Sequence, residues 1–328
     1  MAVTPGARSA FGIGRETTPG TPVTATYFPP LSKLDPTDKP EYLVDEGYRG
    51  SMASQYGGVL GPAVSELEFE GPGFVDALGA LLHNVLGDYS VGAAVSGVFP
   101  HTFGLLNSGT GQPPSHTFID SQQLTASTGA RVYPGAAISE LTLSGNAEGL
   151  FEVSGKATAY PSAAAGSAMT NTPTSESIIP AWRSTVSIAG SPATNVSEWS
   201  VSLERELMVA HTADGSQGPY TIGRGPLKVS GKLTFIALDE SPLITGLLTN
   251  QQPALVITVN NGGSTGALRE IAITCTKAAY QDAAQKRDTL LGWDVNFAAM
   301  ANATDAAASG GLSPVKAVLK NLVADYAA

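Results

Sequence analysis

The sequence contains little charge and almost no cysteine. Only 14% of its 328 residues are charged, compared with about 25% in an average soluble protein. Gly, Ala, Ser and Thr fill the shortfall, which suits a subunit whose surface is mostly covered by neighbours. The single cysteine, Cys275, cannot form an internal disulfide, so disulfide bonds cannot hold this chain's fold together.

Basic residues are also too few for a protein that grips nucleic acid. The net charge is -10, whereas binding through phosphates requires clustered Lys and Arg. No run of about eighteen apolar residues occurs, and residues 1–10 lack the apolar stretch of a signal peptide. We therefore expect a soluble chain, made in the cytoplasm, that has no membrane partner.

Motifs that support catalysis or cofactor binding are missing as well. There is no Gly-x-Ser-x-Gly elbow and no phosphate-binding loop, and Gly12-Ile13-Gly14 lacks both a preceding strand and a third glycine. Cys275 alternates with Ile271 and Ile273, which indicates a buried core position. The histidines lack metal-ligand spacing and are interpreted as surface or incidental residues: His83, His101, His116 and His211. We expect no enzyme activity, no metal and no cofactor.

The chain divides into an N-terminal arm and one large domain. Residues 1–60 are rich in Gly, Pro and Thr, which predicts an extended arm that is ordered only against neighbouring subunits. Residues 61–328 form the domain. Within it, two segments without sustained periodicity are interpreted as loop insertions, at about 88–137 and 161–196.

Two segments show helix signals. Apolar residues recur at helical spacing from Pro72 to Leu86, with Gly87 placed as a C-terminal cap. A second helix is indicated at 239–248, where a capping residue precedes Pro242 at the first helical position. The C-terminal segment 315–323 fits either a helix or a strand.

Alternation of apolar and polar residues predicts the strands. Two hairpins are expected, one from 138–146 and 151–160 and the other from 198–207 and 227–235. A three-stranded antiparallel run is expected from 254–259, 268–280 and 291–297. The two hairpins share short sequence echoes, Ser139–Leu143 with Ser197–Val201 and Val153–Thr158 with Val229–Thr234, which indicate two copies of one unit.

Several segments together resemble a known family. Residues 14–23, followed by Tyr27-Phe28-Pro29-Pro30, are similar to the opening of the tail tube (major tail) proteins of long-tailed bacteriophages. Further similar segments follow in the family's order: Arg49-Gly50, Glu68–Gly71, Gly218–Gly223 leading into Val229–Gly231, and the ending Asn321–Tyr326.

This resemblance implies a mainly β subunit with two packed antiparallel sheets in a sandwich or barrel, one or two flanking α-helices and long extended loops. It also implies hexameric rings, in which two hairpins from each subunit form a barrel around a lumen, and rings that stack into a tube conducting DNA during ejection. The implied location is the tail of the virion. The implied partners are other copies of the chain and the tape-measure, tail terminator and distal tail proteins. The resemblance of the C-terminal segment to the end of the family's sequences favours a strand there.

The lumen of such a tube would be lined by the polar faces of the two hairpins. Each hairpin strand alternates with an apolar face that must meet the helix and the second sheet, so its polar residues are left for the lumen. Five glutamates and three lysines are the candidates: Glu140, Glu152, Lys156, Glu198, Glu204, Glu206, Lys228 and Lys232.

The main alternative is a carbohydrate-binding or adhesive β-sandwich of a tail tip or cell surface. Such a module needs exposed aromatic side chains, but Trp199 and Trp293 alternate with apolar residues and are predicted to be buried. Trp182 is then the one tryptophan left that could provide an exposed surface for stacking against a sugar. A hydrolase would require Glu204 and Glu206 to form a catalytic pair in a cleft, and no neighbouring residue in the sequence would separate their pKa values.

Overall fold

The computed structural model describes residues 6–122, 129–165, 169–236, 246–287 and 291–327. It shows two antiparallel sheets, of eleven and seven strands, and the helix α1 (Val75–Leu86). Two short 3-10 turns, η1 (Gly6–Arg8) and η2 (Ala181–Arg183), and the helical residues 246–248 are also described. This confirms the predicted mainly β class with two sheets. Within the described residues, no helix is long and apolar enough to cross a membrane.

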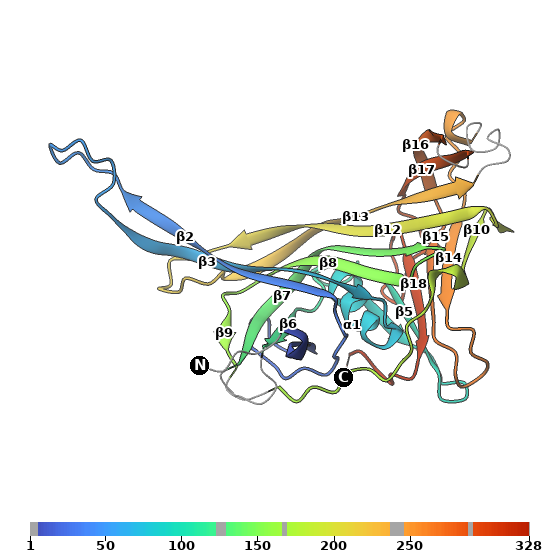
Figure 1. Ribbon diagram of the computed structural model, residues 1–328, viewed down its shortest axis with the longest axis horizontal. Coiled ribbons are helices and arrows are strands. Elements are labelled where there is room, and N and C mark those ends of the chain that lie inside the picture. The colour runs from blue at the N-terminus through green and yellow to red at the C-terminus, as the bar shows by residue number, and fades with distance from the viewer. Residues whose placement is uncertain (1–5, 123–128, 166–168, 237–245, 288–290, 328) are drawn as a thin grey trace.

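The larger sheet has eleven strands, eight of which follow the order β16-β17-β13-β12-β7-β8-β3-β2 (Figure 1). β6 pairs with the first half of β7, β1 pairs with β6, and β9 pairs with β7. The strands are β1 (Ala10–Arg15), β2 (Lys33–Asp45), β3 (Gly57–Pro72), β6 (His116–Ser121), β7 (Ala130–Asn146), β8 (Phe151–Ala159), β9 (Ala163–Ala164), β12 (Val196–Ala210), β13 (Thr221–Ile236), β16 (Ala278–Arg287) and β17 (Leu291–Ala299).

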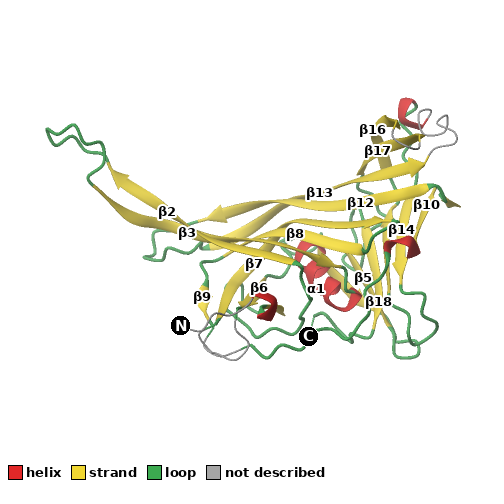
Figure 2. Ribbon diagram, viewed as in Figure 1, coloured by secondary structure: helices red, strands yellow, loops and turns green. Residues whose placement is uncertain are grey.

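The smaller sheet has seven strands in the order β11-β10-β14-β15-β18-β5-β4. Figure 2 shows it standing at one end of the long strands of the larger sheet, with α1 beside both. Its strands are β4 (Gly87–Val91), β5 (Phe99–Leu105), β10 (Ser184–Ile188), β11 (Ser191–Pro192), β14 (Leu255–Asn260), β15 (Glu270–Cys275) and β18 (Lys316–Asn321).

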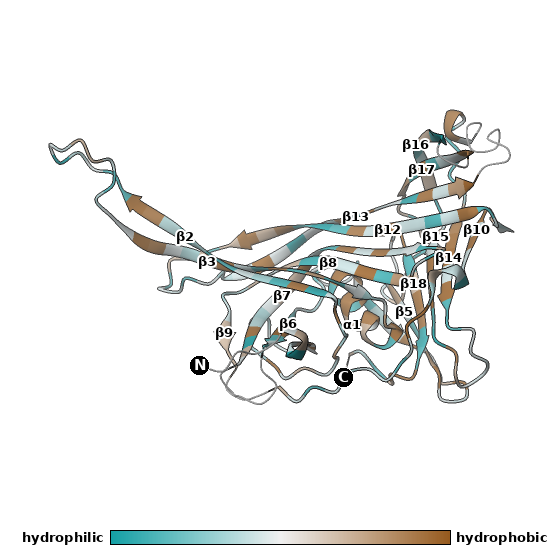
Figure 3. Cartoon of the chain, viewed as in Figure 1, coloured by the Kyte–Doolittle hydropathy of each residue, from teal (hydrophilic) through white to brown (hydrophobic). Residues whose placement is uncertain are grey.

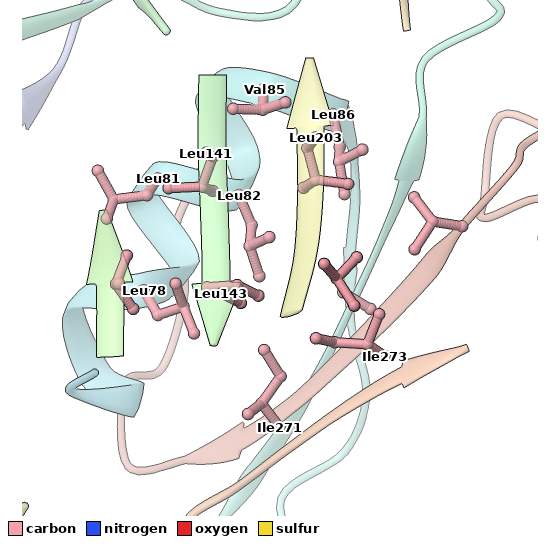
Figure 4. Packing of buried hydrophobic residues seen from close by; sticks show 14 of the residues in the cluster. Leu78, Leu81, Leu82, Val85, Leu86, Leu141, Leu143, Leu203, Ile271 and Ile273 are labelled. Carbon is pink, nitrogen blue, oxygen red and sulfur yellow. The ribbon is translucent and has the colours of Figure 1, made fainter. Parts of the chain in front are cut away.

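The main core lies between the two sheets and α1. The helix contacts β7 of the larger sheet and β4, β5 and β18 of the smaller one. All of its residues except Asp76 are buried. Figure 4 shows leucines of α1, β7 and β12 facing Ile271 and Ile273 of β15. The apolar face of each predicted hairpin therefore packs as the alternation indicated.

A glycine in the middle of α1 has a packing reason. Gly79 weakens a helix by about 1 kcal/mol relative to alanine, but a Cβ at this position would lie 2.2 Å from the ring of Tyr326. Tyr326 is buried, and its hydroxyl donates a hydrogen bond to the carbonyl oxygen of Asp76, 2.6 Å away. The C-terminal segment is thus fixed against the helix, and Gly87, with a φ of 84°, ends the helix as predicted.

The N-terminal segment is more integrated into the subunit than the sequence indicated. Phe11 and Ile13 of β1 are buried in the main core, and β1 pairs with β6 of the same chain. The expectation that residues 1–60 are ordered only against neighbouring subunits is therefore wrong for β1. β2 and β3 form a long hairpin, which the sequence analysis missed. The division into an arm and a domain stays a prediction.

The two segments interpreted as loop insertions supply strands to both sheets. Segment 88–137 contributes β5 to the smaller sheet and β6 to the larger one, and segment 161–196 contributes β10. Apart from the first part of β7, which begins at Ala130, their strands are short and separated by turns, so no sustained alternation marked them. Residues within 88–137 also complete the core, because Phe103 and Phe118 are fully buried.

The predicted three-stranded run is divided between the sheets. The segment 268–280 is not one strand: β15 ends at Cys275 in the smaller sheet, and β16 begins at Ala278 in the larger one. Between them, Asp305 accepts hydrogen bonds from the backbone N–H and hydroxyl of Thr276, at 2.7 and 2.6 Å, and so fixes the crossing. The C-terminal segment 315–323, which fitted either a helix or a strand, contains the strand β18. Of the second helix predicted at 239–248, residues 239–245 lie outside the described residues, and residues 246–248 are helical.

The sequence echoes correspond to two adjacent hairpins, β7–β8 and β12–β13, related by an approximate two-fold rotation. Thr142 lies opposite Ser202 where β7 meets β12. On either side of this point, Thr142 lies opposite Ser154 of β8 and Ser202 lies opposite Ser230 of β13. The strand order reads the same from both edges, so β2-β3-β8-β7 repeats as β16-β17-β13-β12.

The two echoing glycines occupy matching positions in this repeat. Gly155 lies opposite Phe69 of β3, and Gly231 lies opposite Phe297 of β17. A Cβ would lie 2.5 Å from the phenyl ring at the first position and 2.4 Å at the second. Each glycine thus allows an aromatic ring of the next strand to lie across its backbone, which a larger residue would prevent.

Candidate functional site

A row of charged side chains crosses the middle of the larger sheet on the face opposite the core. Glu140 of β7 lies opposite Lys156 of β8 and also opposite Glu204 of β12, which in turn lies opposite Lys228 of β13. Lys156 Nζ is 2.9 Å from Glu140 Oε2, and Lys228 Nζ is 3.4 Å from Glu204 Oε2. Four of the eight predicted lumen residues therefore form one row.

A second group lies toward the β16 edge of the same face. Lys232 Nζ is 2.7 Å from Asp294 Oδ2 of β17, and Lys286 Nζ of β16 is 3.8 Å from it. Thr234 donates a hydrogen bond to Asp294 Oδ1, 2.8 Å away. Partial burial alone would raise the pKa of Asp294, but the hydrogen bonds and the lysine charges outweigh it and lower the pKa.

The charged face continues to the other edge of the sheet through residues that the sequence analysis missed. Lys33 Nζ of β2 is 3.6 Å from Glu68 Oε2 of β3, and Lys39 pairs with Glu66. The signal was present, because Ser65 to Glu70 alternate in the same way as the four predicted strands. Asp294, Glu66 and Glu68 should therefore be added to the candidates, together with the lysines beside them, Lys286, Lys39 and Lys33.

The remaining three candidates lie exposed on β8 and β12. Glu152 lies opposite Ser144 near the start of β8, and Glu198 lies opposite Asn146 near the start of β12. Glu206 follows Arg205 at an irregularity in the β12–β13 pairing. All eight predicted residues are thus on the larger sheet, and none is buried. Exposed ion pairs contribute only about 0 to 1 kcal/mol each, so the row adds little to stability.

On the opposite face, two buried arginines lie near the C-terminal end of α1, and Arg205 bonds to it directly. Arg205 donates from Nη1 to the carbonyl oxygen of Val85 and from Nε to that of Gly225, both at 2.9 Å. Arg224 donates from Nη1 to the carbonyl oxygen of Pro113 at 3.0 Å. Cations stabilise the negative end of a helix dipole. Burial lowers the pKa of Arg224 to about 10, and the like charge of Arg205 adds to this effect.

Three histidines are buried, which corrects their interpretation as surface or incidental residues. His101 is within hydrogen-bond distance of the Tyr89 hydroxyl, at 2.9 Å, and of the Val323 carbonyl oxygen, at 2.9 Å. His116 Nδ1 is 2.9 Å from Asn84 Nδ2. Burial lowers the pKa of all three, that of His83 to about 4. They serve as neutral core residues, and only His211 is exposed.

Glu16, in the segment that carries the family resemblance, is a buried carboxylate with four donors. Its oxygens accept hydrogen bonds from the hydroxyls of Ser115 and Thr117, at 2.6 and 2.8 Å. They also accept from the backbone N–H groups of Gly20 and Gly135, at 2.9 and 2.7 Å. A single side chain therefore ties the turn after β1 to β6 and β7, and the sequence gave no indication of this role.

The described residues offer little basis for chemistry. Cys275 is buried, and burial raises the pKa of its thiol to about 12, which leaves it protonated and unreactive. This agrees with its predicted core position. Among the described residues, no three His, Cys, Asp or Glu side chains come together in a group that could hold a metal ion.

The exposed aromatic side chains in the described part of the chain include Trp182, Tyr48 and Tyr220. Trp199 and Trp293 are buried, as predicted. Trp182 is exposed, and the guanidinium carbon of Arg183 lies 4.7 Å from its ring centre. The exposed aromatic side chains come from separate segments of the chain and do not by themselves identify a sugar site.

Comparison with known proteins gives the family. A family model described as phage tail tube protein matches residues 6–314, nearly the whole chain. A search of curated proteins returned no match. The match includes the Glu16 segment, both repeated hairpins and the charged face. The chain therefore belongs to the phage tail tube protein family, as a non-catalytic structural component of the virion tail.

Proposed function

We propose that this chain closes into hexameric rings that stack into a tail tube, with the charged face of its larger sheet lining the lumen through which DNA passes. The observation that carries this proposal is the contrast between the two faces of the sheet. One face is buried by α1 and the smaller sheet. The other carries the charged row and has no covering element among the described residues.

The edges of the larger sheet support closure into a ring. β2 and β16 are the outermost strands of the eight-strand path. A free strand edge presents unpaired N–H and C=O groups and invites pairing with another chain. In a ring, the β16 edge of one copy would meet the β2 edge of the next. Pro36 and Pro40 of β2 lack an N–H group, so this contact would rely partly on side chains.

The composition of the charged face suits passage of DNA without capture. Its predicted lumen residues comprise five glutamates and three lysines, and the three lysines lie beside carboxylates at Glu140, Glu204 and Asp294. The net negative wall would repel phosphates, and the paired lysines would offer them no strong binding site. The tape-measure, tail terminator and distal tail proteins are the further partners that we propose.

Microscopy of the purified chain tests this function. Rings and tubes in negative stain, followed by a reconstruction with Glu140 and Glu204 facing the lumen, are the expected results. A reconstruction that placed these residues on the outer surface would reject the lumen assignment. Monodisperse monomers that bind glycans would favour the carbohydrate-binding alternative instead.

A further inference from the structure

A pocket of about 540 Å³ is lined by residues of both sheets near the C-terminal end of α1. Leu105 comes from β5 of the smaller sheet, and Arg205 and Leu227 come from β12 and β13 of the larger one. Arg205 follows Glu204 in β12, so it points to the face opposite the charged row. Pockets for small molecules usually measure about 300 to 1,000 Å³. This pocket is therefore large enough for a small organic ligand.

The wall of the pocket contains two buried cations without a counter-charge. Arg205 and Arg224 are 6% and 5% exposed, and the hydrogen bonds described for their guanidinium groups all end on carbonyl oxygens. In the described part of the chain, neither arginine forms an ion pair with a carboxylate. Glu16 attracts Arg224 from a distance, but its oxygens accept from four other groups. Buried charges are normally paired, so a counter-ion is missing here.

The free hydrogen-bond donors of the pocket belong to these arginines. Arg224 Nε is buried and has no hydrogen-bond partner among the described residues. The bonds described for Arg205 use Nε and Nη1, and none within the same residues uses Nη2. The amide of Gln112 is already engaged, because it exchanges hydrogen bonds of 3.0 and 2.8 Å with the backbone of Arg224. These few donors suit the two oxygens of one carboxylate, whereas phosphate presents more oxygens that would need donors.

The rest of the wall is largely apolar. Hydrophobic positions recur along β12 and β13 (Figure 3). Leu227 lies opposite Arg205 in the pairing of these strands, so the two side chains share one face. No Asp or Glu lines the pocket, and its large apolar residues are Leu105, Leu106, Met208, Leu227 and Met300. Cationic and apolar surfaces therefore lie side by side, as the binding of an amphipathic anion requires.

We propose that this pocket binds a small apolar monocarboxylate, with its carboxylate at the two arginines and its hydrocarbon part against Leu105, Leu106 and Leu227. The ligand supplies the counter-charge that the described residues lack. A charge-assisted contact of this kind is strong, because the guanidinium groups are held away from water. The inference concerns the core side of the larger sheet and does not depend on the proposed role of the charged face.

Titration calorimetry of the purified chain with hexanoate tests this proposal. We expect saturable binding at one site per chain. Hexanol lacks the charge and acetate lacks most of the hydrocarbon part, so each should bind at least about tenfold more weakly. Inorganic phosphate at the same ionic strength should also bind at least about tenfold more weakly. Hexanol binding equal to that of hexanoate would remove the role of the arginines, and phosphate binding of equal strength would make this an inorganic-anion site. Either result, or no binding of hexanoate, would overturn the proposal.

A tethered carboxylate tests the location of the site. Leu227→Glu places a carboxylate opposite Arg205, where it supplies the counter-charge and competes with the ligand. We expect hexanoate affinity to fall at least about tenfold. Leu227→Gln has the same length without the charge and is the matched control, which should retain most of the affinity. Unchanged binding by the Glu variant, or an equal loss in both variants, would contradict the proposal.

A second measurement uses the unsubstituted chain and so does not depend on how the variants fold. Crystals of the chain soaked with ω-bromohexanoate should show the anomalous signal of bromine beside Leu105 and Leu227. A bromine position elsewhere on the chain, or none at saturating concentration, would overturn the assignment of the pocket.

Discussion

Thr142 and Ser202 bring their hydroxyl oxygens to within 2.6 Å of each other at the point where the two halves of the larger sheet meet. The pair lies on the approximate two-fold axis that relates β7–β8 to β12–β13. The same residues flank the Glu140–Glu204 position in the charged row. This hydrogen bond therefore joins the repeated hairpins across the face that we propose to line the lumen.

Removing either hydroxyl should weaken the contact between the hairpins. We expect Thr142→Val and Ser202→Ala each to lower the free energy of unfolding by about 1 kcal/mol, the usual net contribution of one hydrogen bond. The double variant should be little worse than either single variant, because the second substitution has no bond left to remove. Urea unfolding of the four proteins measures this coupling, and fully additive losses would show that the bond contributes nothing.

Glu16→Gln should destabilise the subunit although it preserves size. The carboxylate accepts from four donors, whereas an amide offers one acceptor oxygen and turns an NH2 group toward donors. We expect a loss of about 2 to 4 kcal/mol in the free energy of unfolding. Glu148→Gln, at an exposed position between β7 and β8, is the control and should change little. A stable Glu16→Gln protein would mean that the four contacts are replaceable.

His83 should make the subunit sensitive to mild acid. Burial lowers the pKa of His83 to about 4, so below the ordinary value near 6.5 the unfolded chain binds a proton that the folded chain does not. Stability is therefore full above pH 6.5 and falls as the pH drops to about 4, by up to about 3 kcal/mol.

The variant His83→Phe isolates this effect. The phenyl ring fits beside Tyr89 and Phe103, whose rings already contact His83. We expect a flatter dependence of the unfolding temperature on pH between 6.5 and 4. Burial raises the pKa of Asp120 and Glu176, which acts in the opposite direction, but both are present in each protein and cancel in the comparison. His211→Phe, at an exposed position, should leave the curve unchanged.

Reversing charge at Glu204 and Glu206 should slow DNA ejection. The double change to Lys places a cation opposite Lys228 and removes the carboxylate that pairs with it, so phosphates would meet an unpaired cluster of positive charge. Tubes should still form, because exposed ion pairs add little stability. Ejection from phage carrying the change should slow or stall, most strongly at low salt.

A graded series makes this test specific. Glu204→Gln with Glu206→Gln should give an intermediate rate, and Glu148→Lys, away from the charged row, should have no effect. Normal ejection by the Lys variant would remove these two residues from the lumen.

The sequence determined the elements whose residues follow one simple period. Helical spacing from Pro72 to Leu86 predicted α1, and alternation predicted the four hairpin strands and the face that each one exposes. It also determined the family, since the resemblance rested on the order of short segments. The helix and the strand faces are local properties, because each follows from which residues share a face of a helix or strand.

Register and partner choice required the tertiary structure. In the sequence echo, Leu143 corresponds to Val201. In the structure, the approximate two-fold rotation relates Leu143 to Leu203, two residues further along the chain. A shift of two residues leaves every side chain on the same face, so alternation cannot detect it. For a similar reason, the segment 268–280 looked like one strand, although its two halves belong to different sheets.

The buried polar groups were likewise decided only by the fold. Glu16, Arg205 and His116 look like surface residues in the sequence, because charged and polar side chains are seldom buried without partners. Their partners lie far away along the chain: Glu16 with Ser115, Arg205 with Val85, and His116 with Asn84. Composition and spacing specify which groups need a partner, but only three-dimensional packing brings the partner within hydrogen-bond distance and makes burial possible.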